Sequence, residues 1–154
     1  MNKKIEGVRR FLADWIGQMH PRYMAVSLTP DFRMPEDSPR GALIEHCILP
    51  ACREAGIPFA LMIGVRRLIN PHLRVAGDAV GIADVAAVNY LCATYPDNRF
   101  LVTMLARENQ HELCVSARKY HNLMIFGCWW FLNNPSLIEE MTRMRFELLG
   151  TSVI

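Results

Sequence analysis

Two kinds of apolar segment alternate along this chain. In residues 3–19 large apolar side chains recur every three or four positions, which predicts an amphipathic helix. His20 and Pro21 end this helix, because a residue that precedes proline avoids the helical region. Residues 23–28 then form a short continuous apolar run, which is typical of a buried strand.

The same alternation continues to the last residue. Strands are predicted at 57–64, 99–105 and 123–128, and helices at 41–56, 82–95, 107–120 and 135–149. Pro50 predicts a break or kink in the second helix. Asn134 and Pro135 are a typical cap and first residue of the last helix. The loops are expected at 29–39 and 65–81, and the second is long enough to suggest a functional role.

Regular alternation of strands and helices predicts an α/β fold with a parallel sheet. The periodicity does not distinguish a (β/α) barrel from a doubly wound sheet. The chain opens on a helix, and Thr151 begins what we interpret as a further strand. We therefore expect residues 1–154 to be a single segment of a larger barrel, holding only part of an active site.

Composition excludes several classes of partner. The net charge is +2 and the basic residues are scattered, so we expect no nucleic-acid binding. The longest apolar run, residues 123–132, is too short to cross a bilayer, and we expect no membrane association. Five cysteines without a CxxC pair indicate reduced core residues of a cytoplasmic protein.

Candidate chemistry follows the ends of the predicted strands, where parallel α/β folds place their sites. These positions carry arginines, side-chain amides and indoles: Thr29, Asp31, Arg33, Arg66, Arg67, Arg107, Asn109, Trp129, Trp130, Asn133 and Asn134. Guanidinium binds carboxylate in a bidentate manner, and an aromatic face suits the apolar side of a sugar ring. The set suggests an anionic, polyhydroxylated small molecule.

Structural roles compete with these interpretations. Arg66 and Arg67 could be a solvated loop pair, and Arg107 could simply pair with an acid. Trp129 and Trp130 are adjacent, so on a strand their side chains would point to opposite faces. The five histidines form no HxH or HExxH spacing, and no serine or cysteine lies in a nucleophile-elbow context. We therefore predict no catalytic residue and no metal ligand in this segment.

Three stretches add a more specific signal. The sequences PFALMIGVR (58–66), FLVTMLARENQHE (100–112) and LMIFGCWWFLNNP (123–135), continued by EEMTRMR (139–145) and LLGTS (148–152), resemble uronate isomerases. The similarity is greatest to the Bacillus-type branch of that family, in the amidohydrolase superfamily. It covers essentially the whole chain and indicates an interior segment of a longer protein.

The resemblance implies a distorted (β/α)8 barrel in which the four predicted strands are strands four to seven. It implies interconversion of D-glucuronate with D-fructuronate and of D-galacturonate with D-tagaturonate, with a divalent metal, usually zinc. The metal ligands of the family would lie outside this segment. Only Trp130 matches a family substrate contact, the second tryptophan of Gly-x-Trp-Trp; Arg66, Arg67 and Arg107 are added as rim residues that attract the sugar carboxylate.

Two other hypotheses remain open at this point. A half-barrel could act as a non-catalytic sugar-acid-binding module, or associate with a second copy to close its sheet. A flavodoxin-like sheet that binds a phosphorylated partner is also conceivable, although no acidic cluster follows the strands. For the longer parent we expect a homo-oligomer, and for the segment alone no activity.

Overall fold

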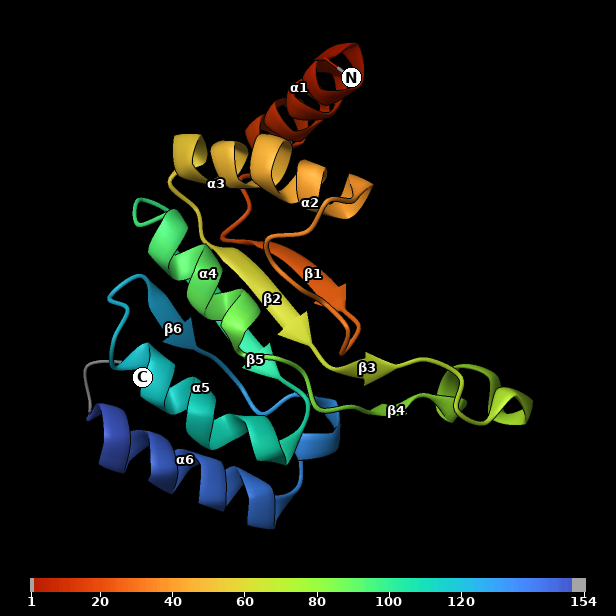
Figure 1. Ribbon diagram of the computed structural model, residues 1–154, viewed down its shortest axis with the longest axis vertical. Helices are drawn as coiled ribbons and strands as arrows, with labels where there is room; N and C mark the ends of the chain where they lie inside the picture. Colours follow the sequence, from red (N-terminus) through yellow and green to blue (C-terminus); the bar gives the residue numbers. More distant parts are fainter. Residues whose placement is uncertain (1, 151–154) are drawn as a thin grey trace.

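The structure, a computed structural model, describes residues 2–150 (Figure 1). Its main sheet has four parallel strands, β1 (Met24–Leu28), β2 (Phe59–Ile63), β5 (Phe100–Met104) and β6 (Leu123–Ile125). The strands lie side by side in the order in which they occur along the chain. A doubly wound sheet reverses its direction at a switch point, so this order is that of a singly wound sheet. The strand predicted from Thr151 lies outside the described residues.

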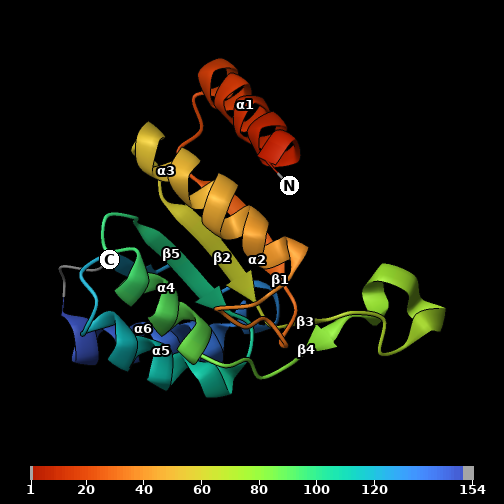
Figure 2. The same ribbon diagram turned by 45° about the horizontal axis from the view of Figure 1, so that its top comes forward.

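Helices follow each strand and cover one face of the sheet. They are α2 (Pro39–Leu43), η1 (Ile44–Ile48), α3 (Leu49–Ala55), α4 (Ala86–Thr94), α5 (Gln110–Ala117) and α6 (Pro135–Leu149). Right-handed crossovers between neighbouring parallel strands place successive helices on the same face, and Figures 1 and 2 show α4 and α5 there. The first helix, α1 (Asn2–Met19), packs on η1 and α3 instead of on the sheet.

The core lies between the sheet and these helices. Alternate strand residues face it, as in the row formed by Leu61 of β2 and Val102 of β5, both fully buried. Val88 and Leu91 of α4 and Leu113 of α5 pack on this face. The expectation that the strands are apolar and buried is confirmed for this side of the sheet.

The opposite face of the sheet is apolar but only partly covered. Its residues form two rows across the strands in register: Ala25, Ala60, Leu101 and Met124, then Ser27, Met62 and Thr103. Ala60 and Thr103 are buried, whereas Ala25, Ser27 and Met124 are exposed. Small and apolar side chains in matched rows are typical of the inward face of a barrel wall.

Residues 65–81 form an arm, not the irregular loop predicted from the sequence. Strands β3 (Val65–Arg66) and β4 (Ala79–Val80) pair antiparallel, and the 3₁₀ segment η2 (Pro71–Gly77) forms the tip. The arm projects from the end of the sheet (Figures 1 and 2). Gly77 is required near the tip, because a Cβ there would overlap the carbonyl oxygen of Asn70.

The second predicted helix also differs from the prediction. It begins at Pro39, where the Ser38 hydroxyl accepts a hydrogen bond from the Gly41 amide at 3.1 Å. Pro50 causes no break, because the preceding turn, Ile44–Ile48, is a π-helix. Its wider hydrogen-bonding pattern accommodates a residue that cannot donate a backbone hydrogen bond.

Other boundaries shift by a few residues. The helix predicted from residue 82 begins at Ala86. The helix predicted from residue 107 starts as the 3₁₀ turn η3 (Arg107–Asn109). The strand predicted to residue 128 ends at Ile125. The last helix matches its prediction: the Asn134 side chain accepts from the Leu137 amide at 3.3 Å. Within residues 2–150 no helix has both the length and the apolar character that crossing a membrane requires.

Buried asparagines hold the amino-terminal ends of the strands together. The Asn122 amide nitrogen donates to the carbonyls of Cys92, Tyr95 and Asn98 at 3.1–3.2 Å. The Asn98 amide nitrogen donates to the Leu49 carbonyl at 2.8 Å. These bonds engage carbonyls at the end of α4, in the turn before β5 and in the first residue of α3.

Replacing Asn122 with alanine is therefore expected to lower the free energy of unfolding by about 2–3 kcal/mol, because three carbonyls lose a donor. The matched control is Asn133→Ala, at an exposed asparagine, which is expected to change stability by less than about 0.5 kcal/mol. Urea denaturation followed by far-UV circular dichroism measures both. Equal effects of the two substitutions would contradict the assigned role of Asn122.

Candidate functional site

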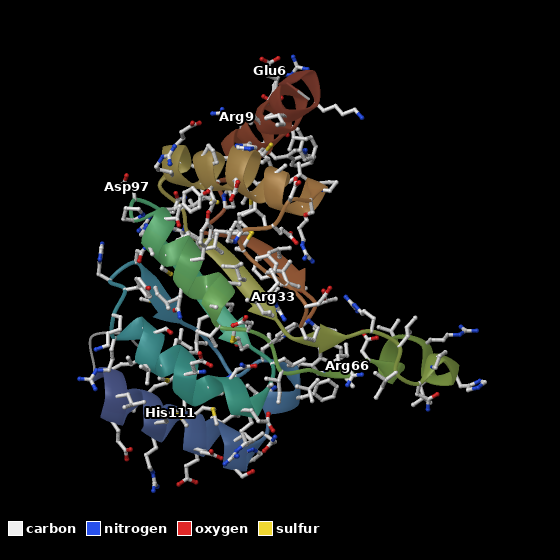
Figure 3. The ribbon with its side chains drawn as sticks, viewed as in Figure 1. Glu6, Arg9, Arg33, Arg66, Asp97 and His111 are labelled. Atoms are coloured by element: carbon white, nitrogen blue, oxygen red, sulfur yellow. The ribbon has the colours of Figure 1, made fainter. Side chains whose placement is uncertain are left out.

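The carboxyl ends of the four parallel strands meet at one edge of the sheet, and the loops beyond them form the candidate site. Arg33, which follows β1, and Arg66, which follows β2, are labelled at this edge in Figure 3. Parallel α/β folds bind ligands beyond this edge, because the loops there converge while the strands fix their bases.

The loops after β1 and β2 are packed against each other. A Cβ on Gly81 would lie 2.4 Å from Cγ of Pro30 and 2.8 Å from Cγ of Arg66, so the aliphatic stem of Arg66 rests on this glycine. Arg33 donates to the Phe32 carbonyl at 2.9 Å, and its Nε lies 3.8 Å from an oxygen of Asp84. Arg66 is therefore held beside the β1 loop while its guanidinium is exposed.

Arg67 points into the arm. Its Nη1 lies 2.6 Å from Oδ2 of Asp78, and Oδ1 of the same carboxylate accepts from the Leu68 amide at 2.8 Å. The Asp78 side chain is almost completely enclosed. The Leu68 amide, and then the Arg67 guanidinium, lower the pKa of Asp78 below its ordinary value. The contact closes the arm and engages Arg67 within it.

Arg107 lies at the end of β5 but turns toward α6. Its Nη2 and Nε lie 2.6 and 3.0 Å from the two carboxylate oxygens of Glu140, a bidentate pair. This carboxylate raises the pKa of Arg107 further. The structural alternative considered for Arg107, pairing with an acid, is the geometry observed.

The two adjacent tryptophans lie beyond the last strand, so the expectation for a strand, that their side chains point to opposite faces, does not apply to them. Gly127, at φ 62°, takes the chain out of the sheet after β6, and Trp130 begins the 3₁₀ turn η4 (Trp130–Leu132). The Trp129 and Trp130 rings are 6.0 Å apart, and Trp130 stacks on Phe131 at 4.8 Å and 12°. Trp130 is 40% exposed, and offers an aromatic surface at this edge.

Asn109, predicted as a rim residue, is structural. Its side chain accepts from the Ala83 amide at 3.0 Å and donates to the Ala83 carbonyl at 2.8 Å. These two hydrogen bonds hold the backbone of Ala83 outside a helix. Helix α4 therefore begins later than predicted. Asn134 is likewise used as a helix cap.

The sequence did not lead us to two residues that make contacts at this edge. Arg145 of α6 donates to the Gly127 carbonyl, and Gln110 of α5 is buried beside it. A sequence signal did exist for Arg145. It follows the buried Met141 by four residues, so both side chains lie on the same inward-facing side of α6, where a charged residue is unusual.

Among residues 2–150, no three histidine, cysteine, aspartate or glutamate side chains lie close enough together to hold a metal ion. The five cysteines are free, and four are buried as expected. Burial raises the pKa of Cys52 and of Cys92 to about 12, so both thiols stay protonated near neutral pH. The carboxyl edge of the described chain thus presents the exposed side chains of Arg66 and Trp130.

Comparison with solved structures gives a clear match. A uronate isomerase from Bacillus halodurans C-125 superposes with a TM-score of 0.93 and 61% sequence identity, over 96% of this chain and 35% of that chain. Two further structures share the fold. A uronate isomerase from Thermotoga maritima has a TM-score of 0.76 and 13% sequence identity, over 90% of this chain and 38% of that chain. A glucuronate isomerase from Caulobacter crescentus has a TM-score of 0.77 and 18% sequence identity, over 96% of this chain and 37% of that chain. No family model and no curated protein matched the sequence.

The fold defines the chain as an α/β protein with a singly wound parallel sheet of four strands and flanking helices. Within that class its structural neighbours are uronate isomerases, and the resemblance seen in the sequence is confirmed. The chain spans about a third of the length of the structures it matches.

The arm provides a test of the Arg67–Asp78 contact. Because the pKa of Asp78 is lowered in the folded chain, the stability that its carboxylate adds is complete above the ordinary aspartate pKa and is lost as the pH falls through the lowered value. We expect the Leu68 amide resonance to titrate in that acidic window, as followed by NMR.

Asp78→Asn should abolish this titration, since the amide oxygen still accepts from Leu68 but does not ionise. Asp84→Asn, at an exposed aspartate, is the control and should leave it unchanged. A Leu68 resonance that titrates identically in Asp78→Asn would show that another group controls the arm.

Proposed function

We propose that this chain is part of a longer uronate isomerase that interconverts D-glucuronate with D-fructuronate and D-galacturonate with D-tagaturonate. The observation that carries the proposal is the 61% identity to a uronate isomerase, sustained over 96% of the chain with a TM-score of 0.93. Identity of this level over matched backbone supports a shared reaction, whereas the other two neighbours support the fold alone.

In this proposal the four strands are strands four to seven of a (β/α)8 barrel. Sequential strand order, helices on one face and the small, apolar rows of the other face support it. In a closed barrel the partly covered rows would face the interior, and the carboxyl edge would form part of the mouth.

The rim residues would bind the sugar acid. Among residues 2–150, Arg66 forms no ion pair with a carboxylate, whereas Arg67 and Arg107 do. We therefore rank Arg66 first for the carboxylate of the hexuronate, and assign to Arg67 and Arg107 a supporting electrostatic role. The stacked rings of Trp130 and Phe131 would contact the apolar face of the sugar.

The reaction moves a proton between C2 and C1, and a divalent metal, zinc by resemblance, would polarise the substrate oxygens. Residues 2–150 do not fit such a metal, since no cluster of ligands occurs among them. The proposal accordingly assigns the ligands and the base to polypeptide beyond this segment, and no step of the reaction to its residues.

The test is an assay of the purified 154-residue chain with D-glucuronate and with D-galacturonate, with and without added zinc. We expect no turnover, whereas the uronate isomerase of Bacillus halodurans run in parallel is the positive control. Extending the chain at both ends with the flanking coding sequence should restore turnover of one or both sugars. An inactive extended protein that binds zinc would refute the proposed reaction; turnover by the short chain would refute the placement of its catalytic groups.

A second function is favoured by one observation. Within residues 2–150 the outer strands of the sheet are β1 and β6, and one of its faces carries the exposed Met124. Such a surface can bind a second copy of the same chain, so a self-associating half-barrel without catalytic activity is the alternative.

Sedimentation velocity distinguishes this alternative. A self-associating module should form a defined dimer that Met124→Lys dissociates, because the substitution places a charge on the apolar face. Ile138→Lys on α6 is the matched control, with 38% exposure against 43% for Met124, and should leave the dimer intact. A monomer at all concentrations, or equal effects of both substitutions, would exclude the alternative.

A further inference from the structure

Arg145 joins the loop that carries the tryptophans to the end of a neighbouring strand. We define the tryptophan loop as residues 126–132. The Nη2 atom of Arg145 lies 2.8 Å from the Gly127 carbonyl oxygen and 3.3 Å from Oε1 of Gln110. One guanidinium thus contacts the loop and the first residue of α5 together.

The contact lies where the backbone pairing of the sheet stops. The Phe126 amide donates to the Val102 carbonyl at 3.1 Å and extends the pairing of β6 with β5 by one residue. The next residue, Gly127, has φ 62° and turns away, so the pairing of β6 with β5 ends there, while the Leu105 amide after β5 still donates to the Ile63 carbonyl of β2. Side-chain donors replace the missing pairing.

Gln110 supplies the other half of this bridge. Its Nε2 donates to the carbonyl of Met104, the last residue of β5, at 2.7 Å, and reaches the Ala106 carbonyl at 3.3 Å. Its Oε1 accepts from Arg145. A continuous chain of hydrogen bonds therefore runs from the end of β5 through two side chains to the tryptophan loop.

The far end of the same loop is held by the start of α6. The Asn134 amide nitrogen lies 3.4 Å from the Phe131 carbonyl, while its oxygen caps the helix. The loop is consequently fastened at Gly127 and at Phe131, and both fastening residues belong to α6 or its cap. The Trp129 and Trp130 rings lie between these two points.

The charge of Arg145 is not explained by an ion pair. In the part of the chain from residue 2 to residue 150, its hydrogen bonds go to neutral oxygens, and its Nε is buried without a partner. Arg143, two residues earlier, is exposed and pairs with Glu139 at 2.9 Å. A half-buried guanidinium is costly to desolvate, and here its Nη2 atom alone contacts both the loop carbonyl and the Gln110 oxygen.

We propose that Arg145 is a positioning residue that fixes the tryptophan loop, and with it the orientation of the Trp130 ring, through the Gly127 carbonyl. Its effect on the rings is independent of the proposed isomerase function; only the consequence for sugar-acid binding rests on that function. The role lies in the placement of an aromatic surface and includes no contact with substrate.

The experiment uses the 154-residue chain with Trp15→Phe, so that Trp129 and Trp130 are the remaining tryptophans. Near-UV circular dichroism reports the fixed geometry of the two rings, and acrylamide quenching of their fluorescence reports exposure. In Arg145→Met we expect loss of the near-UV tryptophan signal and stronger quenching, with the far-UV spectrum retained. Arg143→Met is the matched control and should change neither signal.

Unchanged tryptophan signals in a folded Arg145→Met chain would overturn the proposal. If that variant does not fold, Arg145→Lys decides, since lysine keeps the charge but its side chain is one bond shorter and its nitrogen does not reach the position of Nη2: a weakened near-UV signal supports the proposal and a full signal refutes it. These readouts need no turnover, so a failure of the isomerase assay leaves this test intact.

Discussion

The structure depends on the alternation of side chains across its parallel sheet. Residues such as Leu61 and Val102 face the helices and are fully buried, while their neighbours Met62 and Leu101 face the other way. Each crossover joins neighbouring strands, and right-handed crossovers of this kind place the helices that follow the strands on one side. One face is thereby sealed, and the other is left apolar and partly covered.

The same arrangement determines what the carboxyl edge can do. Four loops converge there, and side chains that bond to backbone groups fix two of them: in the loop after β2, Asp78 closes the arm and Asn109 fixes the segment before α4, and after β6, Arg145 holds the tryptophan loop. The guanidinium of Arg66 and the ring of Trp130 remain available at the surface. The edge consequently presents these two exposed groups on loops that side-chain hydrogen bonds hold in place.

Helical and strand periods were sufficient to predict the class of fold, and the Asn134–Pro135 pair located the last helix. What the periods could not predict depends on contacts between distant residues. The arm requires Asp78 to meet Leu68 and Arg67, and the late start of α4 requires Asn109 to bind Ala83. The fourth strand was predicted to end at residue 128, directly before Trp129 and Trp130, because nothing local signals the left-handed turn at Gly127 except the glycine itself. Of the predicted arginines, the partners of Arg67 and Arg107 lie 11 and 33 residues away.

The central claim, which rests on the proposed half-barrel, is that the second face of this sheet is accessible in this chain and becomes covered in a longer protein. Methionine oxidation by dilute hydrogen peroxide, read by mass spectrometry, tests it most directly, because Met62 and Met124 lie on that face and Met104 lies in the sealed core. In the 154-residue chain, Met124 and then Met62 should oxidise well before Met104, and in the extended protein both should become as protected as Met104. Equal protection of all three methionines in the short chain would contradict the account.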